Sequence, residues 1–365
     1  MQNDVGQLLL VGLPGQELDP ETAAVLRRVQ PGGFILFGRN IGSPAQLRKL
    51  IDDLRDLSRV EPVITIDQEG GRVSRLRLIG EEPPNAQQLR DKGDPELVRR
   101  HGELTAQLLR LFGFNLDLCP VLDISFDDEA DNSLRGRCYG KTSAQVIDLA
   151  GVFNDALRAG GILSCGKHFP GYSMAGEDPH HGFPVIARDR EEMEAHELAV
   201  FRHFASRVDS MMIGHIHYAA LDTHVRPASL SPVVINGLLR DGMGFRGLVM
   251  TDDLDMGAIL NTVSFEDMLA LGLVAGNDLL MICHRVNLLA DARAVLDKQP
   301  PRLLDQALER VAAFKTSMSA PTAFSQDAFD AINRGIWDLR VATLGEARAR
   351  EKSVEDGKRS PVEIY

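Results

Sequence analysis

The chain has 365 residues, of which 52 are acidic and 40 basic, and its formal net charge is −12. Nucleic acid and anionic membrane surfaces repel a protein of this charge, so we expect neither as the main partner. A small polar ligand suits the composition better. The length exceeds that of most single domains, yet α/β barrels often reach it as one unit.

The cysteines and the first residues predict where the protein works. None of the four cysteines stands in a CxxC pair, and two lie in apolar runs where a reduced thiol packs as a small hydrophobe. The N-terminal stretch lacks a basic start, its apolar run is short for an export signal, and no run approaches the length that spans a bilayer. We therefore expect a cytoplasmic protein without a membrane partner. The sequence sets no oligomeric state.

Short apolar runs alternate with helical segments along most of the chain. Strands are predicted at residues 7–13, 33–37, 63–66, 114–118, 162–165, 210–213, 248–250 and 278–282. Helices are predicted at residues 21–29, 44–57, 95–111, 144–158 and 325–344. Runs that are apolar throughout indicate a parallel sheet covered on both faces. Eight of them predict an α/β fold closed into a (β/α)₈ TIM barrel, with an open doubly wound sheet as the alternative.

The last part of the chain changes character. We predict one barrel domain over residues 1–320 and a C-terminal helical extension with a charged tail over 321–365. The helix at 325–344 is followed by a charged run, and such termini are usually a solvated helix and a frayed end. We expect that behaviour here.

The segment 161–184 combines an apolar strand with charged residues directly after it. Lys167 and His168 follow the run, and Asp178, His180 and His181 come next. The pair Pro170-Gly171 breaks regular structure, so these polar residues are predicted on a connection. In a barrel, chemistry lies where the strands end. The segment is therefore expected to carry part of an active site.

Asp252 is the strongest carboxylate candidate because it directly follows the apolar run at 247–250. Asp253 and Asp255 crowd it, and three like charges facing one cavity would repel one another. At most one or two of them are expected to be buried and ionised there. For Asp253 and Asp255 a role in capping the next helix is an equally good interpretation.

Asp178 and His180 stand two residues apart on a glycine-containing loop. An aspartate that accepts a hydrogen bond from one imidazole nitrogen fixes the tautomer and raises the basicity of the other. His180 would then shuttle a proton near neutral pH. The alternative is an exposed loop histidine that has no function, and we expect this of His181.

Further polar residues follow other strand ends. They are Asp67, Glu69, Arg72, Arg75, Arg135, Arg137, Lys167 and His168. Converging acids, cations and imidazole suit a ligand rich in hydroxyl groups, because they offer acceptors and fixed donors in one pocket. Salt bridges along a barrel rim would produce the same pattern, and the residue types do not separate the two.

His215-Ile216-His217 has the look of a metal-binding pair, since metal-dependent barrel hydrolases use His-x-His at a strand end with a late aspartate. The remaining ligands of a divalent site are not evident. A metal-dependent hydrolase is therefore the weaker alternative.

Five motifs together resemble one family. They are GGFILFGRN at 32–40, IDQEGGRVSRL at 66–76, GKHFPG followed by EDPH at 166–180, PASLSP at 227–232 and GFRGLVMTDDLDMGAI at 244–259. In this order they resemble the single-domain bacterial β-N-acetylglucosaminidases (β-hexosaminidases) of glycoside hydrolase family 3, which serve cell-wall recycling. The match covers most of residues 1–290.

The resemblance implies a (β/α)₈ barrel that hydrolyses terminal β-linked N-acetylglucosamine with retention, through a covalent intermediate. By position, Asp252 would be the nucleophile, His180 the general acid/base and Asp178 its partner. The sugar-binding positions would be Asp67, Arg75, Arg137, Lys167 and His168. No metal or organic cofactor is implied, and the partner is a carbohydrate such as a peptidoglycan fragment.

The same scaffold suits a β-glucosidase, a phosphorylase or a sugar-binding protein without turnover, so these stay open. Two departures from the family pattern bear on them. Tyr172-Ser173 replaces the usual His-Gly, and Pro179 separates Asp178 from His180. Proline restricts the residue before it to extended conformations, so it either presets the dyad or hinders its movement. The dyad residues themselves are intact.

Overall fold

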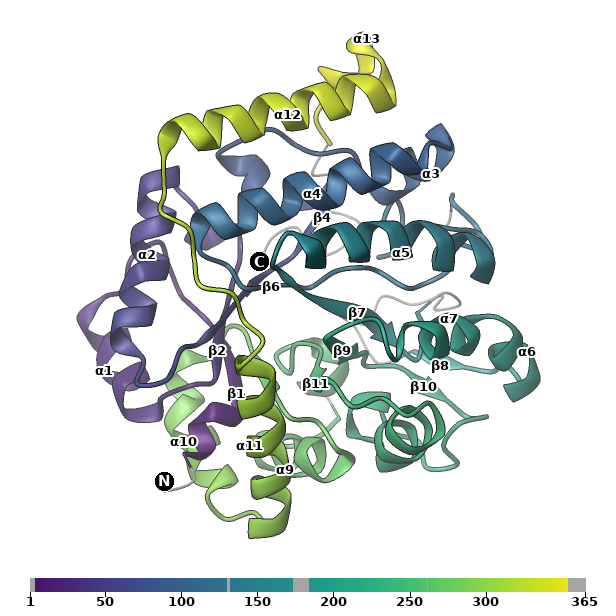
Figure 1. Ribbon diagram of the computed structural model, residues 1–365. Helices are drawn as coiled ribbons and strands as arrows, with labels where there is room; N and C mark the ends of the chain where they lie inside the picture. Colours follow the sequence, from purple (N-terminus) through teal and green to yellow (C-terminus); the bar gives the residue numbers. More distant parts are fainter. Residues whose placement is uncertain (1–3, 130–131, 173–183, 261, 354–365) are drawn as a thin grey trace.

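The computed structural model describes residues 4–129, 132–172, 184–260 and 262–353. Within these residues eight parallel strands form one sheet in the order β11-β9-β7-β6-β3-β2-β1-β12 (Figure 1). Their bounds are β1 Leu9–Gly12, β2 Gly33–Leu36, β3 Val63–Ile66, β6 Leu116–Asp117, β7 Leu163–Phe169, β9 Ser210–Ile213, β11 Leu248–Thr251 and β12 Leu280–Ile282.

The two ends of this sheet meet. A parallel bridge joins Met250 of β11 to Leu279, and the Leu254 amide donates to the Met281 carbonyl at 2.9 Å. The sheet therefore closes on itself. The predicted (β/α)₈ barrel is confirmed, and the open doubly wound alternative is wrong.

The barrel strands are buried along their whole length, apart from the half-buried Leu163 at the start of β7. Side chains on one face of each strand fill the barrel, and those on the other pack under the surrounding helices. This double coverage explains why the runs are apolar throughout.

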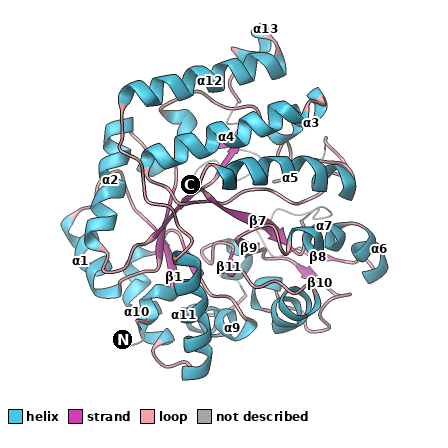
Figure 2. Cartoon of the chain, viewed as in Figure 1, coloured by secondary structure: helices cyan, strands magenta, loops and turns pink. Residues whose placement is uncertain are grey.

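Helices surround the strands on the outside (Figure 2). Those that follow the strands around the barrel are α1 Pro20–Val29, α2 Pro44–Leu57, α4 Pro95–Phe112, α5 Ser143–Ala159, α7 Glu197–Phe204, the π-helical η5 Val233–Gly242, α9 Phe265–Ala275, α10 Leu289–Leu296 and α11 Pro301–Lys315. Smaller helices are α3 Ala86–Lys92, α6 Arg190–Ala195 and α8 Gly257–Leu260. No described helix is at once long and apolar enough to span a bilayer.

Local signals account for the helix starts. Ser43 accepts a hydrogen bond from the Gln46 amide at 3.2 Å, and Pro44 occupies the first helical position of α2. Asp19 caps α1 in the same way, accepting from the Thr22 amide at 2.9 Å. Caps of this kind satisfy amides that have no partner within the helix, which is why these boundaries can be predicted closely.

Short elements lie at the strand ends. Strands β4 Gln68–Gly70 and β5 Val73–Ser74 form a hairpin after β3, and β8 Val185–Ile186 pairs with β10 His217–Tyr218. The short helices are η1 Val5–Leu8, η2 Gly38–Asn40, η3 Arg75–Leu78, η4 Ala228–Leu230 and η6 Val286–Leu288. The predicted strand at 7–13 is thus partly wrong, because its first residues belong to η1.

Strand β7 is longer than predicted and includes Lys167 and His168, which were expected on the following connection. Gly166 lies inside the strand rather than ending it. An added Cβ there would meet the Leu122 side chain at 2.7 Å and the Met211 sulfur at 3.2 Å. Close packing therefore requires glycine at this point, and the strand continues to Phe169, which pairs with Ile213 of β9.

The C-terminal helix α12 Gln326–Leu344 runs along α4 and is followed by α13 Glu346–Ala349 (Figure 1). Phe329, Ile336 and Leu339 of α12 are buried, and the rings of Phe112 and Phe329 are 5.6 Å apart. The expectation of a solvated helix is wrong, because one face of α12 is apolar and covers α4.

Candidate active site

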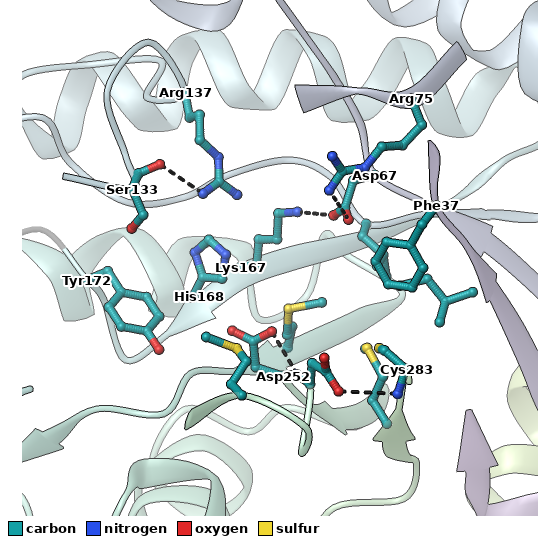
Figure 3. Close-up of a pocket in the computed structure, with 16 residues that line it drawn as sticks. Phe37, Asp67, Arg75, Ser133, Arg137, Lys167, His168, Tyr172, Asp252 and Cys283 are labelled. Atoms are coloured by element: carbon teal, nitrogen blue, oxygen red, sulfur yellow. Dashed lines mark hydrogen bonds and ion pairs between the residues drawn. The ribbon is translucent and has the colours of Figure 1, made fainter. Parts of the chain in front are cut away.

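One pocket opens at the carboxyl ends of the barrel strands (Figure 3). Together with its open mouth it encloses about 680 Å³, a size that suits a small ligand. Its polar lining residues are Asp67, Arg75, Ser133, Arg137, Lys167, His168, Tyr172, Asp252 and Asp253. Its apolar and sulfur-containing lining residues are Ile35, Phe37, Leu118, Met212, Met256, Met281 and Cys283.

Lys167 forms the centre of a buried charge network. Its Nζ atom lies 2.7 Å from Oδ1 of Asp67 and 2.6 Å from Oε1 of Glu69. Burial by itself would lower the pKa of the Lys167 ammonium, but the two carboxylates raise it above its usual value. Lys167 is therefore a fixed cation and hydrogen-bond donor, not a base.

Two arginines extend this network. Arg137 donates to both oxygens of Glu69 at 2.7 Å, a bidentate pair. Arg75 lies 3.5 Å from Asp67. Burial opposes ionisation of Asp67, yet Lys167 and Arg75 together keep its pKa below the ordinary value. Each acid and each base in the network is consequently ionised near neutral pH.

Asp123 does not line the pocket, but it binds two residues that do, His168 and Tyr172. Its Oδ2 atom accepts from Nδ1 of His168 at 2.7 Å, and its Oδ1 atom accepts from the Tyr172 amide at 2.7 Å. Because Nδ1 of His168 carries the hydrogen of this bond, Nε2 is left for the pocket. The rings of His168 and Tyr172 then meet edge to face, 5.2 Å apart.

Asp252 differs from the other acids of the pocket. It follows β11 directly, its amide donates to the Ile213 carbonyl at 2.9 Å, and its Oδ1 atom accepts from the Asp253 amide at 2.8 Å. Within the described part of the chain it has no ion-pair partner. Its carboxylate faces the pocket across from the cations, which suits a group that must meet a ligand.

The other two acids of this cluster have structural roles. Asp253 accepts from the amides of Asp255 and Cys283 at 2.9 and 3.2 Å. Asp255 accepts from the His284 amide at 2.6 Å and pairs with Arg285. Both acids bind backbone amides, but those of Cys283 and His284 follow β12 and do not belong to the helix after β11, so the structure does not support these acids as caps of that helix.

The structure brings six of the predicted site residues to this pocket. They are Asp67, Arg75, Arg137, Lys167, His168 and Asp252. Asp178 and His180 lie outside the described residues, as do Ser173 and Pro179.

Sequence reasoning named Glu69 only among the polar residues after strand ends, and it gave no site role to Asp123 and Tyr172, which hold or line the pocket. A signal was present for Glu69 and Asp123, because each lies within a few residues of a strand end. Nothing in the residue types indicated their partners.

The His-x-His pair serves another purpose. His215 donates from Nε2 to the Asp253 carbonyl at 2.8 Å, and its Nδ1 atom lies 2.8 Å from the Ser229 hydroxyl. Nδ1 of His217 lies 3.1 Å from the Arg226 carbonyl. Among the described residues no group of three His, Cys, Asp or Glu side chains is arranged to hold a metal ion.

The pocket therefore offers the Asp252 carboxylate, which has no ion-pair partner among the described residues, opposite a wall of fixed donors and acceptors. Such a wall binds several hydroxyl groups at once. A carboxylate in this position can attack an electron-poor carbon of the bound molecule.

Known proteins with similar sequences and structures identify the family of this chain. The sequence profile of the glycosyl hydrolase family 3 N-terminal domain matches residues 1–314. A β-hexosaminidase of Tolumonas auensis is 34% identical over 300 residues, covering 80% of this chain and 87% of its own. A β-hexosaminidase of Pseudomonas aeruginosa is 32% identical over 277 residues, covering 76% and 82%.

Solved structures extend the comparison. A family 3 β-N-acetylglucosaminidase from a Paenibacillus species superposes with a TM-score of 0.86 at 31% identity, covering 94% of this chain and 68% of that one. A β-N-acetylhexosaminidase from Beutenbergia cavernae gives 0.80 at 25% identity, covering 86% and 98%. From the barrel, the pocket and these relatives together, the chain belongs to glycosyl hydrolase family 3.

Proposed function

We propose that the protein is an exo-acting, retaining β-N-acetylglucosaminidase in which Asp252 is the nucleophile. The observation that carries the proposal is the Asp252 carboxylate, which faces the pocket and has no ion-pair partner within the described chain, while the opposite wall is a buried network of ions. The names of the similar proteins support the choice of sugar.

The fixed wall supplies the binding. Asp67 and His168 offer an acceptor and an imidazole nitrogen, and Lys167, Arg75 and Arg137 offer donors already held by carboxylates. Donors and acceptors that need no rearrangement bind sugar hydroxyls with little loss of entropy. We assign these five residues to the sugar.

The reaction then runs in two displacements. A carboxylate oxygen of Asp252 bonds to C1 as the bond between C1 and the leaving oxygen breaks, and that oxygen receives a proton. Water next attacks C1, gives up a proton and releases Asp252. Both transition states carry positive charge at C1, which the anionic carboxylate stabilises.

The proton is assigned to His180, with Asp178 as its partner. An imidazole next to a carboxylate has a pKa suited to giving and regaining a proton near neutrality. This assignment rests on the position of the two residues in the sequence motif. It replaces the second carboxyl group that most retaining glycosidases use.

For the natural substrate we propose peptidoglycan fragments that carry a terminal β-linked N-acetylglucosamine. The resemblance of five motifs to β-N-acetylglucosaminidases that serve cell-wall recycling supports this choice. We also propose that the protein acts in the cytoplasm, which its four buried cysteines, all unpaired, support.

The test is a panel of aryl β-glycosides, with and without phosphate, applied to the wild type and to Asp252→Asn. We expect turnover of the N-acetylglucosaminide and a loss of about 10⁴-fold or more in kcat for the variant. Intact-mass measurement with a 5-fluoro N-acetylglucosaminyl fluoride, which keeps the 2-acetamido group, should show one sugar bound to the wild type and none to the variant.

Each alternative has its own result in this panel. Sugar 1-phosphate among the products would indicate a phosphorylase, and faster turnover of the glucoside a β-glucosidase. Unchanged kcat in Asp252→Asn, with an unchanged melting temperature, would refute Asp252 as the nucleophile.

A further inference from the structure

Tyr172 lines the pocket but takes no part in the mechanism above. It follows β7, and its side chain is 3% exposed. Its Oη atom accepts a hydrogen bond from the His215 amide at 2.7 Å. Since the oxygen is the acceptor in that bond, the phenolic hydrogen remains free to donate, and the described part of the chain gives it no acceptor. A buried phenol usually finds a partner for this hydrogen, and in a pocket that partner can be the ligand.

The phenol is held firmly in its position. A Cβ atom added at Gly214 would lie 2.5 Å from Cε2 of Tyr172 and 3.1 Å from its hydroxyl oxygen, so the backbone after β9 packs directly against the ring. The Asp123 carboxylate accepts from the Tyr172 amide at 2.7 Å, and the His168 ring meets the phenol edge to face at 5.2 Å. A side chain packed in this way has a fixed orientation. The donor therefore loses little entropy when a ligand binds to it.

The end of β9 holds Tyr172 near Asp252. The Asp252 amide donates to the Ile213 carbonyl at 2.9 Å, and the His215 amide, two residues later, binds the phenol. Burial raises the pKa of the Tyr172 phenol, and the charge of Asp252 raises it further. The phenol therefore keeps its hydrogen near neutral pH and acts as a donor beside the proposed nucleophile.

The proposed mechanism constrains how a sugar lies in this pocket. Its C1 atom must reach the Asp252 carboxylate, and its more distant hydroxyl groups must reach Asp67 and Arg75. Figure 3 shows Asp67 and Arg75 at one end of the pocket and Tyr172 at the other, with His168 between them. In a pyranose the C2 substituent comes directly after C1, and the C3 hydroxyl comes next. With the C3 hydroxyl at His168, the C2 substituent lies beside Tyr172.

We propose that Tyr172 donates its phenolic hydrogen to the carbonyl oxygen of the 2-acetamido group and thereby makes the site select N-acetylated sugars. The inference rests on the proposed function, because it takes C1 to lie at Asp252. An acetamido carbonyl oxygen extends further from the ring than a hydroxyl oxygen at C2 does. A donor whose position is fixed therefore binds the first and not the second. Hydrogen bonds at C2 strengthen in the transition states of retaining glycosidases, so the effect reaches kcat as well as KM.

The test measures kcat and KM of the wild type, Tyr172→Phe and Tyr218→Phe. The substrates are the 4-nitrophenyl β-glycosides of N-acetylglucosamine, N-trifluoroacetylglucosamine and glucose. Tyr218 is the matched control, since it is 2% exposed and its hydroxyl donates to the Gly171 carbonyl at 2.6 Å, one residue before Tyr172. Both variants remove one buried phenolic oxygen from the same region, but Tyr218 is not part of the wall of this pocket.

Loss of one hydrogen bond to the substrate should lower kcat/KM of Tyr172→Phe for the N-acetylglucosaminide about tenfold and leave that for the glucoside within about twofold. Fluorine weakens the carbonyl oxygen as an acceptor, so the trifluoroacetyl substrate should cost the wild type more activity than it costs Tyr172→Phe. The unpaired His215 amide in Tyr172→Phe lowers the melting temperature, but it acts on every substrate alike. Tyr218→Phe should keep the ratio between the sugars that the wild type shows.

An equal loss on all three glycosides would make Tyr172 a purely structural support and overturn the proposal. The same ratio of N-acetylglucosaminide to glucoside in all three proteins would overturn it too. A wild type that hydrolyses none of the glycosides would refute the proposed function, whereas calorimetry with free N-acetylglucosamine and free glucose would still decide the role of Tyr172. The preference of the wild type for N-acetylglucosamine should then shrink about tenfold in Tyr172→Phe, and an unchanged or absent preference contradicts the proposal.

Discussion

Glu69 joins the two cations on the binding wall of the pocket, and we predict that Glu69→Gln disrupts that wall. The carboxylate accepts from Arg137 at 2.7 Å twice and lies 2.6 Å from Lys167. Glutamine has nearly the same shape but carries no charge. It also turns an N–H group toward one of the cations. Both cations would stay buried, Arg137 without its bidentate partner and Lys167 with Asp67 as its remaining carboxylate partner among the described residues.

The size of the effect follows from this burial. Glu69 is 5% exposed and Arg137 is 6% exposed. Breaking a buried ion pair by removing one partner costs about 3–5 kcal/mol. For a chain of 365 residues the entropy of unfolding is roughly 0.8 kcal/mol/K. The melting temperature of Glu69→Gln should therefore fall by about 4–6 °C.

The matched control is Glu61→Gln. Glu61 pairs with Arg55 at 2.7 Å, the same distance, but its side chain is 50% exposed. Exposed pairs contribute about 0–1 kcal/mol, so this variant should melt within about 1 °C of the wild type. Sugar affinity should weaken only in Glu69→Gln, and it is measured as KM for the aryl glycoside.

The pH dependence provides a second check. Burial opposes ionisation of Glu69, but Arg137 and Lys167 hold its pKa below the ordinary value of 4.5. A depressed pKa adds stability that is complete above 4.5 and is lost as the pH falls below it. In urea unfolding, the difference in free energy of unfolding between wild type and Glu69→Gln should be largest at pH 7 and shrink below about pH 4.5. Equal melting temperatures for Glu69→Gln and Glu61→Gln would refute the reasoning. So would a difference in free energy of unfolding between wild type and Glu69→Gln that stays constant in acid.

Three further substitutions test other parts of the molecule. Neither ring nitrogen of His101 has a partner among the described residues, and burial lowers its pKa to about 4. The free energy of unfolding of the wild type should thus rise with pH between about 4 and 6.5. Urea unfolding should show that His101→Leu, compared with the wild type, is about 2 kcal/mol better off at pH 5 than at pH 7. Arg340 is buried and donates to Glu82 at 2.9 Å and to the Ala349 carbonyl at 2.7 Å, so Arg340→Ala should lose about 3–5 kcal/mol. If Arg340→Ala melted at the same temperature as the wild type, the contact between α12 and Glu82, which precedes α3, would not contribute to stability. Gly214→Ala should press the Tyr172 ring out of place at a cost of about 1–3 kcal/mol. An unchanged kcat in Gly214→Ala would contradict the close contact between this backbone and the ring.

The sequence by itself determined the architecture and the position of the main carboxylate. Apolar runs of strand length, helix caps such as Ser43-Pro44 and charged residues after strands are local patterns. The strand before Asp252 and the helix at 44–57 were therefore predicted to within a residue. Local patterns are sufficient here because each records what one segment needs: burial on both faces, or a capped first turn.

Tertiary structure decided which charges meet. Lys167 is 100 residues from Asp67 in sequence, and Arg137 is 68 from Glu69. Only closure of the barrel brings these pairs within hydrogen-bond distance. It also decided that β7 continues through Lys167, since an isolated bridge joins Val121 to Lys167 and Ile213 of β9 pairs with Phe169, both past Gly166. A residue type shows that a side chain can carry charge, whereas its partner depends on segments distant in sequence. Among the described residues, that packing leaves Asp252 without an ion-pair partner beside a wall of paired charges.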